Sequence, residues 1–223
     1  MMNVSSSSKL VLVASGKERL PGVLELPSGP RGMVLFAHDS ASSRLSPRNS
    51  YVAGELRQAG LGTLLFDLLS RDEDSDDRHR FDIALLGARL GNAAHWLAQQ
   101  PETRGFALGL FGASTGAAAA LQLAADRPEQ VAAVVSRGGR PDLAGSDELA
   151  RVRAPTLLIV GGEDHGIIER NRQALRELTC EKELAVVRGA THQFEEPGTL
   201  AEVARLAARW FKGYLVTRPQ SAV

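Results

Sequence analysis

The sequence has little cysteine, no long apolar run and no excess of charge of either sign. Cys180 is the only cysteine, which excludes a disulfide framework within the chain and favours a reducing compartment. The 26 basic and 26 acidic residues cancel, so the charge gives no indication of nucleic acid or of an anionic membrane as a partner. No apolar stretch approaches the roughly 20 residues that span a bilayer, and the polar first ten residues are unlike a signal peptide. We therefore expect a cytoplasmic protein.

The chain does have enough apolar residues for one large core. Hydrophobic residues make up 43% of the 223 positions, and a single α/β domain of this length is ordinary. The sequence shows no internal repeat and no linker-like change of composition. We expect a frayed tail over residues 1–8, one domain over residues 9–214 and a short tail over residues 215–223.

Eight short apolar runs have the length of β-strands. Several are apolar almost throughout, as is typical of strands buried on both faces of a parallel sheet. The first two are close together and separated by a polar turn, which predicts an antiparallel hairpin at one edge. The runs cover residues 10–14, 23–26, 33–37, 63–68, 106–111, 131–136, 156–160 and 184–187.

Helical patterns alternate with the later runs. They cover residues 47–59, 81–100, 114–128, 168–178 and 200–214. This alternation after an initial hairpin predicts an α/β fold with a mostly parallel eight-stranded sheet and helices on both faces. Because such sheets bind ligands beyond the carboxyl ends of their strands, the loops at those ends are where chemistry is expected.

One of these loops carries the sequence Gly112-Ala113-Ser114-Thr115-Gly116, a G-x-S-x-G pattern between an apolar strand and a helix. A serine on such a sharp strand-to-helix turn needs neighbours without side chains, which the two glycines provide. The turn exposes the serine hydroxyl, and the N-terminus of the following helix favours negative charge beside it. The pattern indicates a nucleophilic serine. The alternatives are a turn that merely permits tight packing and a phosphate loop, although a dinucleotide motif would place G-x-G-x-x-G after the first strand.

A serine hydroxyl needs a base that removes its proton, and the base needs an orienting acid. In hydrolases with this turn the order along the chain is serine, acid, histidine. Glu163 and Asp164 follow the strand expected at residues 156–160, and His192 follows the strand expected at residues 184–187. We take Asp164 as the acid because its shorter side chain suits an imidazole partner, and Glu163 is the alternative.

The remaining histidines and the cysteine fit these roles less well. His165 precedes the final strand, which breaks the expected order, and is interpreted as a loop residue. His95 lies on an expected helix and is interpreted as a partly buried packing residue. His79 lies in the acidic run 71–80, interpreted first as a solvated loop and alternatively as a border of the pocket that disfavours anionic substrates. Cys180 ends an expected helix away from these loops, which favours an inert thiol.

These stretches together resemble an α/β-hydrolase of the dienelactone hydrolase family, over roughly residues 20–214. The resemblance rests on LFAHDSASSRLSPRN, TLLFDLL, LFGASTG, VVSRGGRPDL, PTLLIVGGEDHGII and GATHQFEEPG, in that order. It implies Ser114 as nucleophile, His192 as general base and acid, and Asp164 as orienting acid.

The activity implied by the resemblance is hydrolysis of small carboxylic esters or lactones through an acyl-enzyme, without cofactor or metal, by a monomer or homodimer. Backbone amides of Ser40 and Thr115 would stabilise the oxyanion. Founding members of the family use a cysteine nucleophile, so Ser114 favours ordinary esters over dienelactones. The alternatives are a non-catalytic ligand-binding protein of this fold, and acyl transfer or perhydrolysis by the same residues.

Three charged residues at strand ends, Asp39, Arg137 and Arg140, are candidates for substrate contact. The two arginines either bind a substrate carboxylate or hold the glycine turn through backbone carbonyls. Residues 137–155 have room for a short helix but not for a cap domain, which predicts an open or shallow site.

Asp39 departs from the family pattern, in which the strand ends in His-Gly. The sequence here is His38-Asp39-Ser40. Aspartate tolerates unusual backbone angles better than most residues, but a carboxylate that faced the oxyanion would oppose its charge. We therefore expect the Asp39 side chain to turn away from Ser114, towards backbone amides or Arg44.

Overall fold

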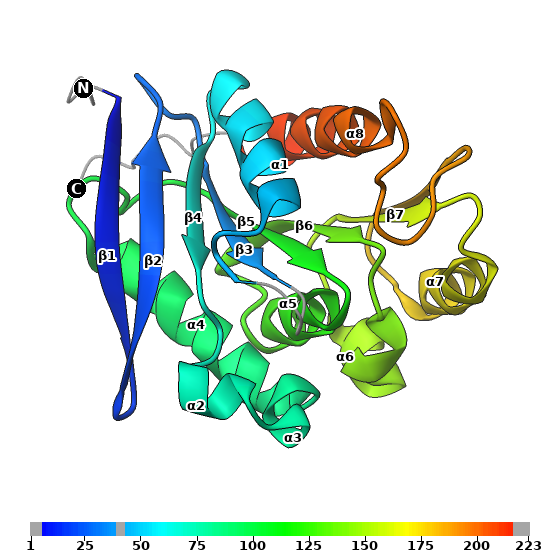
Figure 1. Cartoon of the computed structure of the whole chain (residues 1–223), viewed down its shortest axis with the longest axis horizontal. Helices are drawn as coiled ribbons and strands as arrows, with labels where there is room; N and C mark the ends of the chain where they lie inside the picture. The colour runs from blue at the N-terminus through cyan, green and yellow to red at the C-terminus, as the bar shows by residue number, and fades with distance from the viewer. Residues whose placement is uncertain (1–5, 39–42, 216–223) are drawn as a thin grey trace.

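A computed structural model describes the chain over residues 6–38 and 43–215. Its strands are β1 (Ser7–Ser15), β2 (Glu18–Leu26), β3 (Met33–Ala37), β4 (Gly62–Phe66), β5 (Leu108–Ala113), β6 (Val131–Arg137), β7 (Thr156–Gly161) and β8 (Lys182–Val187). They form one sheet in the order β1-β2-β4-β3-β5-β6-β7-β8 (Figure 1). β1 and β2 form an antiparallel hairpin, β2 pairs antiparallel with β4, and the pairs from β4–β3 to β7–β8 are parallel. The predicted α/β fold with an edge hairpin is confirmed.

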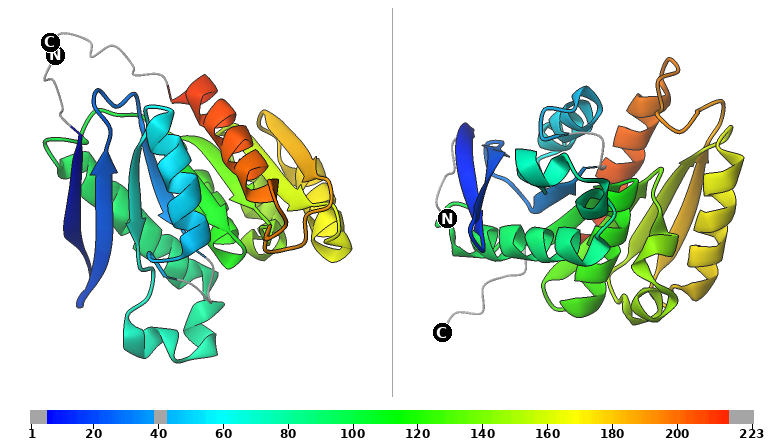
Figure 2. Two further views of the ribbon diagram at one scale, coloured as in Figure 1. Left: turned by 45° about the horizontal axis from the view of Figure 1, so that its top comes forward. Right: turned by 60° about the horizontal axis from the view of Figure 1, so that its bottom comes forward.

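Helices cover both faces of this sheet. α1 (Pro47–Gln58) and α8 (Thr199–Tyr214) lie side by side on one face, as both views of Figure 2 show. The other face carries α4 (Ile83–Gln99), α5 (Thr115–Asp126), α6 (Ser146–Arg151) and α7 (His165–Glu177). Two single-turn helices, α2 (Arg71–Asp74) and α3 (Asp77–Arg80), precede α4, and a 3-10 turn, η1 (Pro141–Ala144), precedes α6.

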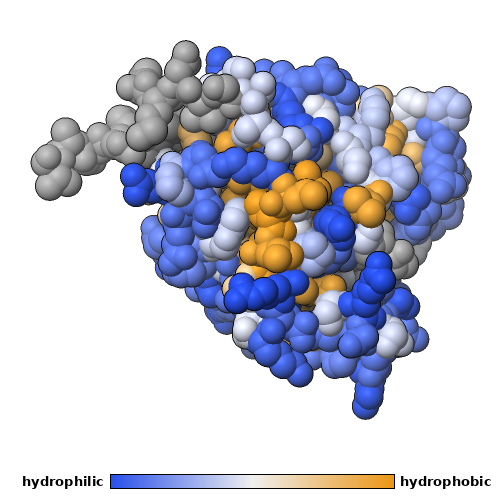
Figure 3. Space-filling view, turned by 60° about the vertical axis from the view of Figure 1, so that its left-hand side comes forward, coloured by the Kyte–Doolittle hydropathy of each residue, from blue (hydrophilic) through white to orange (hydrophobic). Residues whose placement is uncertain are grey.

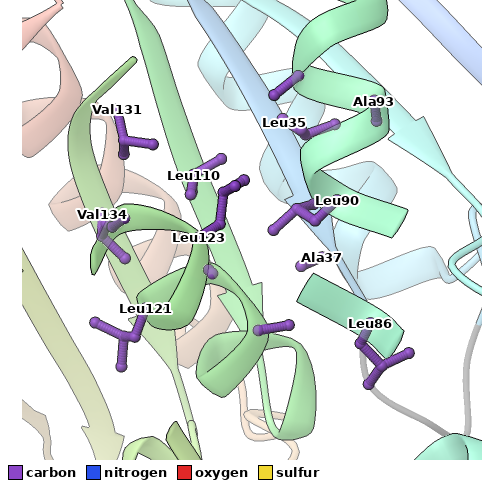
Figure 4. Packing of buried hydrophobic residues seen from close by; sticks show 14 of the residues in the cluster. Leu35, Ala37, Leu86, Leu90, Ala93, Leu110, Leu121, Leu123, Val131 and Val134 are labelled. Carbon is purple, nitrogen blue, oxygen red and sulfur yellow. The ribbon is translucent and has the colours of Figure 1, made fainter. Parts of the chain in front are cut away.

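The central strands are apolar throughout because both of their faces are buried, as their sequence pattern predicts. On the α4 and α5 side, Leu35 and Leu110 of the sheet meet Leu90 and Leu123 of the helices (Figure 4). The alanines at the start of α5, residues 117–120, are fully buried. Their small side chains let α5 lie close to the sheet, which places its first turn at the carboxyl ends of β3 and β5.

Three segments differ from the sequence-based expectations. The acidic run 71–80, expected as a loop, forms α2 and α3, because the Ser70 hydroxyl and the Glu73 carboxylate make a reciprocal capping box around the first turn. α7 begins at His165, three residues before the expected start, and Asp164 occupies its N-cap position without a capping bond from its side chain. His165 is therefore helical and not a loop residue. β1 begins at Ser7, inside the stretch expected as a tail over residues 1–8.

The outer face of the edge hairpin is apolar. Leu10 and Leu12 alternate along β1 and are 85% and 58% exposed. Figure 3, which brings this side of the molecule forward, shows hydrophobic residues gathered in one patch. Among the helices of the described residues, none is both long enough and apolar enough to cross a membrane.

Candidate active site

Ser114 stands on the sharp turn between β5 and α5. Its backbone angles, φ 50° and ψ −119°, are unusual for a residue with a side chain, and such strain costs about 1–3 kcal/mol. The flanking glycines are required because neighbouring backbone atoms approach them too closely to leave room for a side chain. A Cβ on Gly112 would lie 2.4 Å from Cα of Ala117, and a Cβ on Gly116 would lie 2.2 Å from the carbonyl oxygen of Ala37. The turn therefore holds the serine at the carboxyl edge of the sheet, as the G-x-S-x-G pattern predicts.

Asp164 and His192 meet at the same edge. Asp164 follows β7 and is the N-cap of α7, whereas His192 lies in the loop after β8. Nδ1 of His192 lies 2.6 Å from Oδ2 of Asp164. Because a carboxylate accepts hydrogen bonds, Nδ1 carries the proton in the neutral ring, which leaves Nε2 free to accept one. The imidazole is 37% exposed and the carboxylate 18% exposed, so the imidazole is the more accessible of the two to solvent.

The turn over residues 137–140, which follows β6, contacts both the serine and the histidine. The backbone N–H of Arg140 donates to the carbonyl oxygen of Ser114 at 3.0 Å, and the N–H of Ser114 points back to the carbonyl of Arg137 at 3.4 Å. Gly138 has φ 51°, and a Cβ there would lie 3.4 Å from Cε1 of His192. This one turn therefore borders both the candidate nucleophile and the candidate base.

The two arginines of this turn have different surroundings. Arg137 is 4% exposed, and its guanidinium carbon lies 5.9 Å from the centre of the Phe194 ring, within the range of a cation–π contact. Arg140 makes a two-pronged ion pair with Asp142, which also receives a bond from Arg170 at 3.2 Å. Burial works against the ionised form of Asp142, but the bond to Arg140 and the two arginine charges outweigh it and lower the pKa of this carboxyl.

The loop that carries His192 is held at both ends. The Glu196 carboxylate accepts the backbone N–H of Thr191 at 3.1 Å, and the hydrogen bonds from Thr191 lower the pKa of Glu196. Phe194, at φ 56°, is almost completely buried beneath the loop. An ion pair of 3.3 Å between Glu195 and Arg48 joins the loop to the start of α1.

Asp39 and Ser40, candidates for substrate contact and for an oxyanion donor, lie outside the described residues. The neighbouring described residues His38 and Arg44 are held by hydrogen bonds. Nε2 of His38 accepts the backbone N–H of Leu68 at 3.1 Å. Asp67 accepts the backbone N–H of Arg44 at 2.7 Å and pairs with its guanidinium.

The alternative candidates lie apart from this centre. Glu163 is exposed, and the bond to His192 comes from its neighbour in the chain. His95 is exposed on α4, so the expectation of partial burial is wrong; its Nε2 lies 2.8 Å from Nε2 of Gln99. His79 lies on α3, where Nδ1 contacts a backbone carbonyl. Burial raises the pKa of the Cys180 thiol, which keeps it protonated.

The sequence profile of the dienelactone hydrolase family matches residues 48–214, three quarters of the chain. The chain belongs to this family. The crystal structure of a dienelactone hydrolase from Anabaena variabilis is 53% identical and has a TM-score of 0.91, over 95% of this chain and 100% of that one. The esterase domain of a Rhodothermus marinus protein shares the fold, with 21% identity and a TM-score of 0.76 over 94% and 99% of the two chains. The resemblance seen in the sequence motifs is confirmed, and family and fold together support a hydrolase.

Two relatives carry a different name. Proteins of two Mycobacterium tuberculosis strains, provisionally named phosphoribosyl transferases, are 55% identical over 205 residues. The match covers 92% of this chain and 46% of theirs. The chain therefore spans about half the length of these relatives.

Several residues that support the site in this dienelactone hydrolase family member escape sequence-based reasoning. Asp67 holds Arg44, Phe194 lies under the histidine loop, and Asn171 of α7 bonds the 137–140 turn. Of these three residues, only Asp67 could have been recognised, because a charged residue directly after a buried strand indicates a position at the ligand-binding edge of the sheet. The other two residues carry no signal of this kind, because neither the burial of Asn171 nor the position of Phe194 under the loop can be recognised from residue type.

Proposed function

We propose that this protein is a serine hydrolase of small carboxylic esters or lactones, with Ser114 as nucleophile, His192 as base and Asp164 as orienting acid. The observation that carries the proposal is the 2.6 Å bond between His192 and Asp164, beside the 137–140 turn, which also bonds the strained Ser114. A serine, an imidazole and a carboxylate in this relation can generate a nucleophile at neutral pH.

The reaction proceeds in two halves. Oγ of Ser114 attacks the ester carbonyl while its proton passes to Nε2 of His192. The tetrahedral intermediate breaks its bond to the alcohol oxygen, which takes the proton from His192 and leaves. Water then attacks the acyl-enzyme, gives a proton to His192 and releases the acid, and Ser114 regains its proton.

The oxyanion of each intermediate needs donors. The backbone N–H of Thr115, the first residue of α5, supplies one, and the partial positive charge at the N-terminus of this 12-residue helix adds to it. The second donor in the proposal is the N–H of Ser40. One such donor contributes about 3–4 kcal/mol to the stability of the transition state.

The proposed substrates are small because little covers the site. Between β6 and β7 the structure has only η1 and α6, of four and six residues. Beside the turn, Arg140 and Arg170 both pair with the carboxylate of Asp142. These guanidinium groups support a substrate with a carboxylate group, which would meet Arg140 at the edge of the site. Arg137 and Asp39 stay candidates for substrate contact.

The test is labelling with a fluorophosphonate followed by location of the adduct. We expect a single adduct on Ser114, turnover of acetate to butyrate esters, and loss of both in Ser114→Ala. Esterase activity that survives in Ser114→Ala would refute the proposal. Tight binding of esters without turnover would favour the non-catalytic alternative, and ester products with added alcohols or peracids with peroxide would favour acyl transfer or perhydrolysis.

The transferase name of the M. tuberculosis relatives makes a competing prediction. That name belongs to proteins about twice the length of the matched segment. A phosphoribosyl transferase would release pyrophosphate from phosphoribosyl pyrophosphate when a base acceptor is present. We expect no such release by this chain, and release that persists in Ser114→Ala would assign transferase activity to it.

A further inference from the structure

Asn171 lies in the second turn of α7 and connects that helix to the 137–140 turn. Its side chain is completely buried. Nδ2 donates one hydrogen bond to the carbonyl oxygen of Gly139 at 3.0 Å and another to the carbonyl oxygen of Ile167 at 2.8 Å. One bond therefore leaves the helix and holds the middle of the turn, while the other fixes the amide to its own helix.

Each residue of the proposed catalytic set has a link to this pair of elements. Asp164 is the N-cap of α7, and its carbonyl oxygen accepts the N–H of Ile168 in the first helical turn. Ser114 is bonded to the turn through Arg140 and faces the carbonyl of Arg137, and His192 packs against Gly138. The Asn171–Gly139 bond thus ties the helix of the acid to the turn that supports both nucleophile and base.

The turn has little freedom to adjust on its other side. A Cβ on Gly139 would lie 2.0 Å from Oγ of Ser136 and 2.6 Å from Cβ of Ala117, so the backbone at Gly139 is pressed against β6 and α5. These atoms fill the space into which a Cβ on Gly139 would project. The amide of Asn171 adds a second restraint, because its bond resists a separation of Gly139 from α7.

The asparagine at this position contributes two hydrogen bonds, but it also has a cost. Oδ1 of Asn171 accepts no hydrogen bond from any residue that the structure describes, and a buried polar atom without a partner costs stability. An apolar side chain of the same shape would avoid that cost, but it would remove the donor to the carbonyl oxygen of Gly139 and, with it, the bond between α7 and the turn.

We infer that Asn171 is a positioning residue of the active site, which holds the 137–140 turn so that Ser114 and His192 keep their relative placement. The inference rests on the proposed function. It predicts that substitution of Asn171 slows the chemical step more than it weakens substrate binding or folding.

The experiment compares Asn171→Leu with the unaltered chain by measuring kcat, KM and the fraction of active sites titrated by a fluorophosphonate at end point. Because titration counts only folded sites, kcat per titrated site is insensitive to partial unfolding. We expect kcat per titrated site to fall about 10- to 100-fold, since loss of one hydrogen bond corresponds to about tenfold and a misplacement near 1 Å to about 100-fold. KM should stay within about twofold.

Thr156→Val is the matched control. Thr156 is also completely buried, and its hydroxyl also donates to a backbone carbonyl, that of Ala154 at 2.9 Å. It lies at the amino end of β7, whereas the site lies at the carboxyl end. We expect the control to change stability and to leave kcat per titrated site unaltered.

If the leucine variant does not fold, Asn171→Ser replaces it. The serine side chain is too short to reach Gly139, so this variant also removes the bond. An unchanged kcat per titrated site in a folded Asn171 variant overturns the inference, as does an equal fall in Thr156→Val. Failure of the proposed function gives a different result, because the unaltered chain would then neither react at Ser114 nor hydrolyse esters.

Discussion

The close approach of α5 to the end of β3 can be tested by adding one methyl group, in Gly116→Ala. The new Cβ would lie 2.2 Å from the carbonyl oxygen of Ala37 and 2.5 Å from that of His38. Ordinary carbon–oxygen contacts are about 3.3–3.6 Å, so the helix and the strand must separate by about 1 Å. Both neighbours are backbone atoms, which cannot rotate away as the end of a side chain would.

The cost can be estimated from this displacement. Overpacking of a tight contact costs about 1–3 kcal/mol, which for a chain of this length lowers the Tm by about 2–12 °C. The same shift moves the first turn of α5, which carries Ser114 and Thr115, relative to the end of β3. A misplacement of about 1 Å costs about 100-fold in rate, so we expect kcat for a butyrate ester to fall by about that factor.

Gly54→Ala is the matched control within α1. The nearest atom to its Cβ is the flexible end of Arg57 at 3.7 Å, so the methyl group fits. Alanine is the better helix former, and we expect the Tm to rise by about 1–4 °C with kcat unchanged. Thermal unfolding followed by circular dichroism and ester hydrolysis at 25 °C measure both variants. A Gly116→Ala protein as stable and as active as the unaltered chain would show that the small residue is not required at this contact.

Four further predictions concern single residues. Asp164→Asn should lower kcat by about 100- to 10,000-fold and Glu163→Gln should not alter it; the reverse ranking in ester assays would transfer the role of acid to Glu163. Ser114→Gly should have a free energy of unfolding about 1 kcal/mol higher than that of Ser114→Ala, because glycine tolerates φ 50° without strain. Its urea midpoint should therefore be higher, and equal midpoints for the two variants would argue against strain. The lowered pKa of Asp142 means that its ion pairs stabilise the fold above its ordinary pKa of 3.8 and cease to do so as pH falls through the lower folded value. Melting curves between pH 5 and pH 2 should therefore show a shallower fall for Asp142→Asn than for the unaltered chain, and parallel curves would contradict this. The raised pKa of Cys180 should make its alkylation by iodoacetamide at pH 8 slower than that of free cysteine, with full ester hydrolysis in Cys180→Ser; fast alkylation would indicate an accessible thiolate.

The sequence predicted the fold well because its signals are local and repeated. Each of the eight strands was marked by an apolar run, and the hairpin by two such runs around a polar turn. The wrong interpretations concern short segments. The capping pair Ser70 and Glu73 was present in the acidic run, but the density of charge favoured a loop. The start of α7 at His165 precedes the first apolar residues of the helix, Ile167 and Ile168, so the hydrophobic pattern does not mark it.

The candidate site was predictable to the extent that side-chain chemistry marks it. Ser114, Asp164 and His192 stand out because each residue type follows a strand, in the order that hydrolases of this kind use. The arginines after β6 also stood out by charge. Their side chains turn to Phe194 and to Asp142, and what they contribute to Ser114 comes from their backbone.

That last distinction explains why the 137–140 turn could not be recognised from residue types. Its contacts with Ser114 use the N–H of Arg140 and the carbonyl of Arg137, groups that every residue except proline can offer. Gly138, the residue of the turn beside His192, has φ 51°, a backbone conformation that favours glycine. Ser114 has its backbone fixed from outside its own strained turn, because β5 and β6 end in register, with Ala113 paired to Arg137, and the chain after β6 bonds Ser114. Register and close approach between strands therefore determine the support of the candidate nucleophile, and both are properties of the folded sheet rather than of any short sequence pattern.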